Sequence, residues 1–444
     1  RYDPAALMAT LQSVRSPRDR GLAEVEMSRV FLQYARDIQT GVLIPKRVDS
    51  RIVRDIPYRD RTAYLTGLVD AKPAAFFRAL PPRSMEYNAL LKEKVAMEQL
   101  LNQGGWGATV PAKSLEAGNT GSAVIALRNR LITMGYLGRS NTMTYDAAMV
   151  DAVQQFQIAH GLNPDGKAGA ATMKQINIGV EQRLQSVMVA LERERWFNTE
   201  RGKRHILVNL TDFSAKVIDN DKVTFETRTV VGSTKADRRS PEFSDEMEVM
   251  VINPSWNVPR SITTKEYLPM MKRNPNAAGH LKLIDSRGRT VSRSSVNFSQ
   301  YTASNFPYSM KQPPSDGNAL GLVKFLFPNK YNIYLHDTPS KNLFSREVRA
   351  FSHGCIRLQQ PFEFAYALLA KQSSDPKGEF QAHLRTGRES VIALKEFVPV
   401  HITYRTAFTE AKRRTQYRRD VYGRDAKVWN ALAKAGVALR AVQG

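Results

Sequence analysis

Residues 331–358 read YNIYLHDTPSKNLFSREVRAFSHGCIRL, and this stretch says more about the protein than any other. It contains the single cysteine of the chain, Cys355, followed two positions later by Arg357. One cysteine in 444 residues excludes an intrachain disulfide, so the thiol is either a small buried apolar group or a reactive one. A second candidate reactive group, His336, ends an apolar run with the pattern of a β-strand.

A cysteine nucleophile needs a base, donors for the oxyanion and a group that orients the base. His353, two residues before Cys355, can share a face with it in extended backbone, whereas His336 can reach it only across strands. The residues alone leave both histidines open as the base. Gly354 has no Cβ and lets a substrate approach the backbone, and the amides around Gly354 and Cys355 are candidate oxyanion donors.

The segment around this motif has a hydrophobic period of two. From His205 onward, short runs rich in Val, Ile, Phe and Tyr recur, and they predict a β-rich, sandwich-like catalytic domain over residues 203–405. Asp219-Asn220-Asp221 predicts a hairpin turn. Residues 262–318 interrupt the pattern and are too long for a simple loop, so we expect an inserted lid or capping subdomain there.

The remaining chain favours helices. Apolar residues at helical spacing predict a helical scaffold over residues 1–116, a compact unit of three short helices over 117–178, and a return helix over 179–202. Residues 406–444 are expected to form a basic hairpin and helix. Over 401–444, ten Lys or Arg stand against three acidic residues, and they suit either a solvated surface or docking on an anionic one.

The formal charge of +23 calls for an anionic partner. A nucleic acid is not expected, because basic residues are spread along the chain and no nucleic-acid-binding motif is visible. Acidic cell-wall polymer or association with a membrane surface fits the charge better. The scattered histidines have no metal-ligand spacing, so neither a metal nor another cofactor is expected.

Two resemblances to known families sharpen this interpretation. The segments VIALRNRLITMGYL and YDAAMVDAVQQFQIAHGLNPDGKAGAATMKQIN resemble the peptidoglycan-binding domain of cell-wall enzymes. The pattern H-x15-S-H-G-C-x-R resembles the L,D-transpeptidase catalytic domain (YkuD-type), and its context resembles the large Gram-negative L,D-transpeptidases. The resemblance implies an α+β protein with a β-rich catalytic domain, an inserted capping subdomain, a helical scaffold and a three-helix peptidoglycan-binding domain.

The resemblance also implies roles for individual residues. Cys355 is the nucleophile, and His336 is its base, oriented through the carbonyl of Asp337. His353 and Gly354 shape the pocket and, with the Cys355 amide, the oxyanion hole, while Ser352 fixes the turn. Further residues are expected to contact the substrate or brace its cleft: Arg357, which can pair with a substrate carboxylate, and Tyr334, Trp256 and Asn257, which are candidate walls.

The implied reaction is acyl transfer between peptidoglycan stem peptides without a cofactor. The third residue of a tetrapeptide stem, a diamino acid, is transferred to Cys355 with release of D-Ala, and then to the amine of another stem, which gives a third-to-third cross-link. The alternatives are an L,D-carboxypeptidase or cross-link hydrolase, and attachment of an outer-membrane protein to the wall. A wall-binding protein with an inactive domain is a further alternative. A periplasmic location, a signal peptide outside this sequence, a role in cell shape and acylation of Cys355 by carbapenems also follow from the resemblance.

Overall fold

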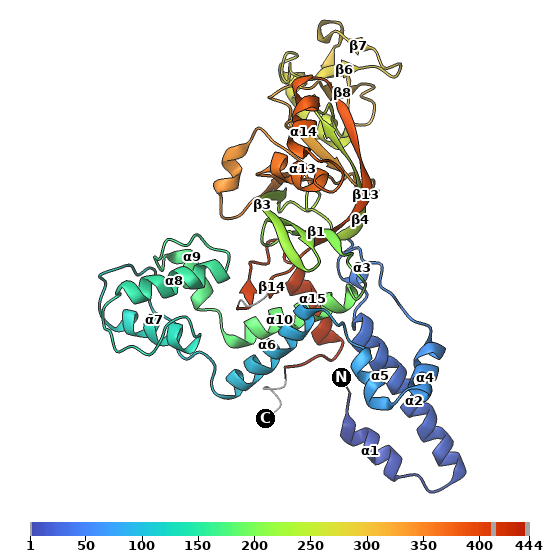
Figure 1. Ribbon diagram of the computed structural model, residues 1–444, viewed down its shortest axis with the longest axis vertical. Coiled ribbons are helices and arrows are strands. Elements are labelled where there is room, and N and C mark those ends of the chain that lie inside the picture. Colours follow the sequence, from blue (N-terminus) through green and yellow to red (C-terminus); the bar gives the residue numbers. More distant parts are fainter. Residues whose placement is uncertain (1, 410–413, 440–444) are drawn as a thin grey trace. The chain divides into compact units, whose positions relative to one another are not determined.

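A computed structural model describes residues 2–409 and 414–439, and contacts divide the chain into two compact units, residues 1–200 with 403–444 and residues 201–402 (Figure 1). The helices of the first unit are α1 (Pro4–Gln12), α2 (Pro17–Thr40), α3 (Pro45–Val48), α4 (Arg61–Asp70), α5 (Pro73–Ala79), α6 (Met85–Asn102), α7 (Ser122–Thr133), α8 (Ala147–Ala159), α9 (Ala170–Ile176), α10 (Val180–Trp196) and α15 (Arg424–Lys434). Strands β14 (Ala407–Phe408) and β15 (Gln416–Tyr417) pair antiparallel in the same unit.

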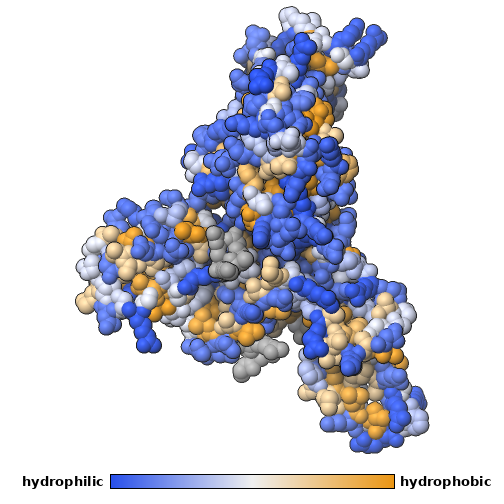
Figure 2. All heavy atoms as spheres, viewed as in Figure 1, coloured by the Kyte–Doolittle hydropathy of each residue, from blue (hydrophilic) through white to orange (hydrophobic). Residues whose placement is uncertain are grey.

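The two longest helices of this unit, α2 and α6, begin at serine caps. Ser16 accepts a hydrogen bond from the N–H of Asp19, whose side chain returns the bond, and Ser84 accepts one from the N–H of Tyr87 at the start of α6. Apolar side chains remain exposed on the helices of this unit, among them Leu22 of α2 and Val69 of α4. Figure 2 shows orange patches over the region that α2 and α4 occupy in Figure 1.

The three-helix unit has its own core, built from Leu127, Leu131, Val153 and Phe156 among others. Two tail arginines bind the C-terminal ends of its helices, where backbone carbonyls lack helical partners. Arg414 donates to the carbonyls of Met134 and Gly135, and Arg418 donates to the carbonyl of Ala159 at 3.0 Å. These tail cations therefore bind within the unit.

Other tail cations are buried. Arg405 bridges Glu86 at 2.5 Å and Glu194 at 2.7 Å, and Arg424 is fully buried against the rings of Tyr404 and Tyr422. Four charged residues of the tail, Glu410, Lys412, Arg413 and Arg440, lie outside the described residues.

The second unit is built on one nine-stranded sheet in the order β11-β3-β12-β10-β9-β4-β13-β1-β2, with β2 also paired to β3. Its strands are β1 (Arg204–Asn209), β2 (Ser214–Asp219), β3 (Lys222–Gly232), β4 (Phe243–Ile252), β9 (Val323–Leu326), β10 (Leu335–His336), β11 (Ala350–Ser352), β12 (Ile356–Leu358) and β13 (Ser390–Thr403). The β-rich domain that the sequence predicts is present, and the pairing of β2 with β3 closes its sheet on itself. A closed sheet and a sandwich of two sheets both bury every second side chain of a strand, so the alternating sequence pattern does not distinguish the two arrangements.

Two helices of this unit, α13 (Pro361–Leu369) and α14 (Pro376–Arg385), follow the nucleophile motif. Phe364 of α13 packs edge-on against Phe325 of β9 at 4.8 Å between ring centroids, so α13 covers the sheet beneath the motif. The expected hairpin is confirmed, because Asn220 and Asp221 have φ of +47° and +63° between β2 and β3.

The capping insertion forms a small folded layer with its own apolar core, which includes Ile262, Leu268 and Met271. Its elements are β5 (Trp256–Asn257), α11 (Arg260–Ile262), the π-helical turn η1 (Thr263–Tyr267), α12 (Leu268–Arg273), β6 (Lys282–Ile284), β7 (Thr290–Val291), the 3-10 turns η2 (Arg293–Ser295) and η3 (Phe298–Gln300), and β8 (Ser309–Gln312). The strands pair in the order β5-β8-β6-β7. The cap therefore begins at Trp256, a few residues before the expected boundary.

Candidate active site

The thiol of Cys355 follows a tight turn between β11 and β12. Ser352 braces this turn, since its Oγ donates to the carbonyl oxygen of Cys355 at 2.5 Å and accepts from the N–H of Gly354 at 3.0 Å. Gly354 has φ of +126°, and a Cβ there would lie 3.2 Å from Cδ1 of Ile333. Only glycine suits this position, and its N–H is already bonded to Ser352 in this state.

Strand register places the two candidate reactive groups on one face. Strands β10 and β12 are parallel neighbours, with Leu335 opposite Ile356 and His336 opposite Arg357. Leu335 and Ile356 are fully buried in the core. Because side chains alternate along a strand, His336 and Arg357 point to the other face, together with Cys355.

His336 is 4% exposed, and its ring is held by backbone. Nδ1 lies 2.5 Å from the carbonyl oxygen of Asp337, and since a carbonyl only accepts, Nδ1 carries the proton. Burial lowers the pKa of His336 to about 3, and the positive charges of Arg357 and Lys324 act in the same direction. The imidazole is therefore neutral in this state.

The carboxylate of Asp337 has a different task from its carbonyl. It accepts from the N–H of Leu322 at 2.9 Å and pairs with Nζ of Lys341 at 2.5 Å. Gly321 makes room for it, because a Cβ there would lie 2.3 Å from the carboxylate. The carboxylate thus fixes the segment that carries the carbonyl, and it lies away from the imidazole Nδ1 bond.

The Cys355 thiol is protonated in this state. Its Sγ lies 3.5 Å from the carbonyl oxygen of Asn332, and burial raises its pKa to about 11, although Tyr334 and the charge of Arg357 act in the opposite direction. Across the described parts of the chain, no hydrogen bond joins Sγ to His336. The pair is a neutral thiol and a neutral imidazole on one face.

Tyr334 links this face to the cap. Its side chain hydrogen-bonds the thiol and the side chain of Trp256, and burial raises its pKa well above the usual value. Its ring centroid lies 5.6 Å from that of His336. Trp256, 9% exposed, belongs to the cap core against which Tyr334 packs. Asn257 is exposed, and its backbone pairs with Lys311 of β8.

Arg357 lies on the same face as His336 and Cys355. Its Nε is buried and no hydrogen-bond partner for it lies among the described residues. Burial lowers the pKa of its guanidinium, while the Cys355 thiolate would raise it. A buried guanidinium with an unsatisfied N–H is suited to an anionic group from outside the chain.

Contacts across the fold add residues that the motif does not identify. His353, which is exposed, places Nε2 2.6 Å from Oε1 of Glu266 in η1, and Arg238 donates to the same oxygen at 2.7 Å. Ser240 donates to the carbonyl of Gly354 at 2.6 Å. Glu266, Arg238 and Ser240 belong to no sequence motif, and their polarity is the only sequence signal that could have identified them.

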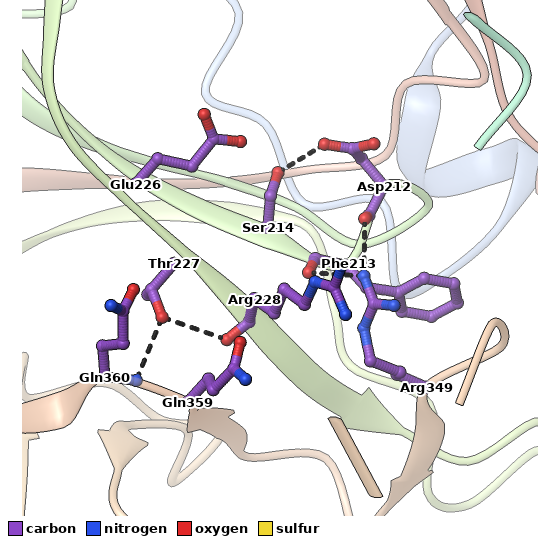
Figure 3. A pocket seen from close by; sticks show the side chains of 9 residues that line it. All are labelled: Asp212, Phe213, Ser214, Glu226, Thr227, Arg228, Arg349, Gln359 and Gln360. Atoms are coloured by element: carbon purple, nitrogen blue, oxygen red, sulfur yellow. Dashed lines mark hydrogen bonds between the residues drawn. The ribbon is translucent and has the colours of Figure 1, made fainter. Parts of the chain in front are cut away.

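A separate open pocket of about 370 Å³ lies near the far end of β12 (Figure 3). Its walls are polar, and they are lined by Asp212, Phe213, Ser214, Glu226, Thr227, Arg228, Arg349, Gln359 and Gln360. Its lining includes neither a thiol nor a histidine.

No cluster of metal-ligating side chains occurs within residues 2–409 and 414–439. In the same residues, every helix is too short or too polar to cross a membrane.

Three families match separate parts of the sequence. Residues 203–380 match the L,D-transpeptidase catalytic domain (YkuD), residues 120–176 match the family described as "Putative peptidoglycan binding domain", and residues 1–93 match a scaffold domain. A curated relative from Haemophilus influenzae, named "Putative L,D-transpeptidase", is 30% identical over 225 residues. That match covers 50% of this chain and 45% of the relative, so the chain spans less than half of the relative's length.

Solved structures with similarity include two L,D-transpeptidases. The one from Xylanimonas cellulosilytica is 13% identical and covers 66% of this chain and 98% of that one, with a TM-score of 0.19. The one from Stackebrandtia nassauensis is 16% identical, and the match covers 67% of this chain and 97% of that one, with a TM-score of 0.26. At these TM-scores neither structure carries an argument about this chain.

Proposed function

We propose that the chain is an L,D-transpeptidase, which transfers an acyl group between peptidoglycan stem peptides through a thioester on Cys355. The observation that carries the proposal is the placement of the single thiol and a carbonyl-oriented imidazole on one face of two paired strands, inside the matched catalytic domain. The domain match over residues 120–176 supports peptidoglycan as the substrate.

In the first step, Sγ of Cys355 attacks the carbonyl carbon of the third stem residue, and its proton passes to His336. The tetrahedral intermediate collapses, the amide C–N bond breaks, and His336 returns the proton to the leaving D-Ala. Because burial keeps thiol and imidazole neutral, the ion pair forms only with the attack. Carbonyls of Asp337 and Leu320 then favour the imidazolium.

Oxyanion stabilisation is assigned to the backbone of the nucleophile turn. The Gly354 N–H is bonded to Ser352, so the Cys355 N–H is the donor that we propose for the oxyanion. Gly354 and His353 shape the pocket beside it. Ser352 holds the turn through two hydrogen bonds.

Arg357 is proposed to bind a carboxylate of the donor stem. Its buried Nε has no partner among the described residues, and its strand position opposite His336 places it on the reaction face. A stem peptide that ends in a diamino acid and D-Ala offers such carboxylates. Tyr334 and Trp256 form the wall toward the cap, and Asn257 lies at its exposed rim.

In the second step, the side-chain amine of an acceptor stem attacks the thioester carbonyl. A C–N bond forms, the C–S bond breaks, and the amine proton returns to the thiol by way of His336. The product is a third-to-third cross-link. Water in place of the amine gives a tripeptide, the product of an L,D-carboxypeptidase, and a protein amine gives attachment of an outer-membrane protein.

The direct test incubates a disaccharide-tetrapeptide with the protein and with Cys355→Ala, and identifies products by mass spectrometry. The proposal predicts a dimer lighter than two monomers by one D-Ala, absent with Cys355→Ala. Tripeptide alone would instead assign the carboxypeptidase reaction. No Cys355-dependent product would refute acyl transfer from this donor. Because the substrate is wall polymer, we place the reaction in the periplasm.

A further inference from the structure

The exposed side of the nucleophile turn is tied to the cap by one carboxylate. Oε1 of Glu266 lies 2.6 Å from Nε2 of His353 and 2.7 Å from a terminal nitrogen of Arg238. The three side chains are 26–34% exposed. We call this trio the Glu266 clasp. It joins three segments that are distant in sequence.

Each side chain of the Glu266 clasp comes from a different structural element. Glu266 lies in η1, within the helical stretch whose apolar residues Ile262 and Leu268 belong to the cap core. A single π-helical turn inside a helix is a frequent feature of functional sites. His353 lies between Ser352 and Gly354 in the braced turn. The carboxylate therefore connects the cap core directly to the nucleophile turn.

Arg238 belongs to the segment between β3 and β4, which packs directly on the same turn. Its carbonyl oxygen lies 2.1 Å from where a Cβ of Gly232 would be, and 3.8 Å from where one of Gly354 would be. Ser240, two residues later, donates to the carbonyl of Gly354. A second, exposed pair joins Lys265 to Asp237 at 3.7 Å.

The cap thus contacts the surroundings of Cys355 at two places. On one side, Tyr334 packs on the cap core and hydrogen-bonds the Cys355 thiol. On the other, the Glu266 clasp holds His353, two residues from that thiol. Ion pairs that keep contact with water are individually weak, so the clasp can open and close while the apolar contact persists.

We propose that Glu266 is a positioning residue that holds the cap closed over the thioester and so favours the amine acceptor over water. This inference rests on the proposed function. An amine on a bound stem peptide is positioned by its own contacts, whereas water needs only access to the carbonyl carbon. Opening the cap therefore speeds hydrolysis of the C–S bond more than transfer.

The test compares the tripeptide-to-dimer ratio of the full chain and of three variants on disaccharide-tetrapeptide. Glu266→Gln keeps the shape of the side chain but removes its charge, and Glu266→Ala removes both. Lys265→Ala is the matched control, because it removes a charge from the same turn and disrupts only the exposed pair. We expect the ratio to rise at least fivefold in both Glu266 variants and to stay within twofold of wild type in Lys265→Ala.

Hydrogen–deuterium exchange supplies a readout that does not need turnover. Loss of the clasp should speed amide exchange in residues 260–267 and 352–354 together in Glu266→Gln, and leave Lys265→Ala as wild type. An unchanged product ratio in both Glu266 variants overturns the inference, whatever the exchange. If the wild-type protein gives neither product, the proposed function fails. In that case, amide exchange in Glu266→Gln that equals the wild-type exchange would also refute the structural role of the Glu266 clasp.

Discussion

At the scale of single residues, the two groups proposed to react, the Cys355 thiol and the His336 imidazole, are neutral in the free protein. Burial raises the pKa of the Cys355 thiol to about 11, so the thiolate is scarce at neutral pH. We expect alkylation of Cys355 by iodoacetamide to accelerate about tenfold per pH unit from pH 7 to pH 10. The rate is measured by intact mass, with Cys355→Ala as the control. A rate that levels off near pH 7 would contradict a protonated resting thiol.

The lowered pKa of His336 predicts that the folded protein loses stability as the pH falls. Burial lowers its pKa from 6.5 to about 3, so between these values the unfolded chain binds a proton that the folded chain does not. The stability associated with the neutral ring is present above pH 6.5 and is lost as the pH falls toward 3. The loss amounts to a few kcal/mol.

The measurement is urea unfolding of the full chain at pH 7 and pH 4, followed by a probe in residues 201–402. His336→Gln should lose clearly less stability between the two pH values than wild type does. Equal losses in both proteins would show that His336 is not the group that titrates.

At the scale of elements, the end of β10 depends on a glycine that touches no reactive group. Gly321 has φ of +62°, and a Cβ there would lie 2.3 Å from the carboxylate of Asp337, which anchors the carbonyl that orients His336. Gly321→Ala should therefore lower kcat at least tenfold. Gly317→Ala is the matched control, because no atom lies within 4 Å of its added Cβ.

The two variants should differ in kcat with similar overall secondary structure by circular dichroism. Full activity in Gly321→Ala would mean that the Asp337 carboxylate is free to move without disturbing His336.

The sequence pattern identified long strands but not the short elements at the site. β1, β2 and β3 lie where the predicted period of two begins, near His205, because their alternation continues over several residues. β11 and β12 were not predicted, since each has three residues and the Ser352–Cys355 turn separates them. The apolar run of α13 was missed because strands and buried helices share that pattern. The pairing of β13 with β4 shifts register at a bulge between Ala393 and Val398, which the period of two does not show.

The candidate site likewise contains residues that the sequence identified and residues that only the fold reveals. Cys355 and His336 stood out through a motif, which is local in sequence. The contact of His353 with Glu266 joins residues 87 positions apart, and only the folded cap brings them together. Likewise, the Gly354 N–H looked available as an oxyanion donor until the turn showed it bonded to Ser352.

At the scale of the whole molecule, the tail residues stabilise the unit that contains residues 1–200. Arg405 bridges the carboxylates of Glu86 and Glu194, and all three side chains are at most 13% exposed. Arg405→Ala leaves two carboxylates buried without their cation, which costs about 3–5 kcal/mol. We expect the melting transition of this unit to fall, while that of residues 201–402 stays in place.

Differential scanning calorimetry of the full chain measures both transitions. Lys167→Ala is the control, because its pair with Glu116 is 57–63% exposed and solvent screens it, so its loss should leave both transitions in place. If both transitions moved together in Arg405→Ala, the two units would not unfold independently.

The central claim is a thioester on Cys355, and trapping that intermediate tests it most directly. The full chain is mixed with disaccharide-tetrapeptide, quenched in acid within seconds and examined by intact mass and peptide mapping. Our account predicts an added mass equal to the donor minus D-Ala, located on the peptide that contains Cys355 and absent from Cys355→Ala. Two results would contradict it: an adduct located on a residue other than Cys355, or turnover of the donor by Cys355→Ala at the wild-type rate.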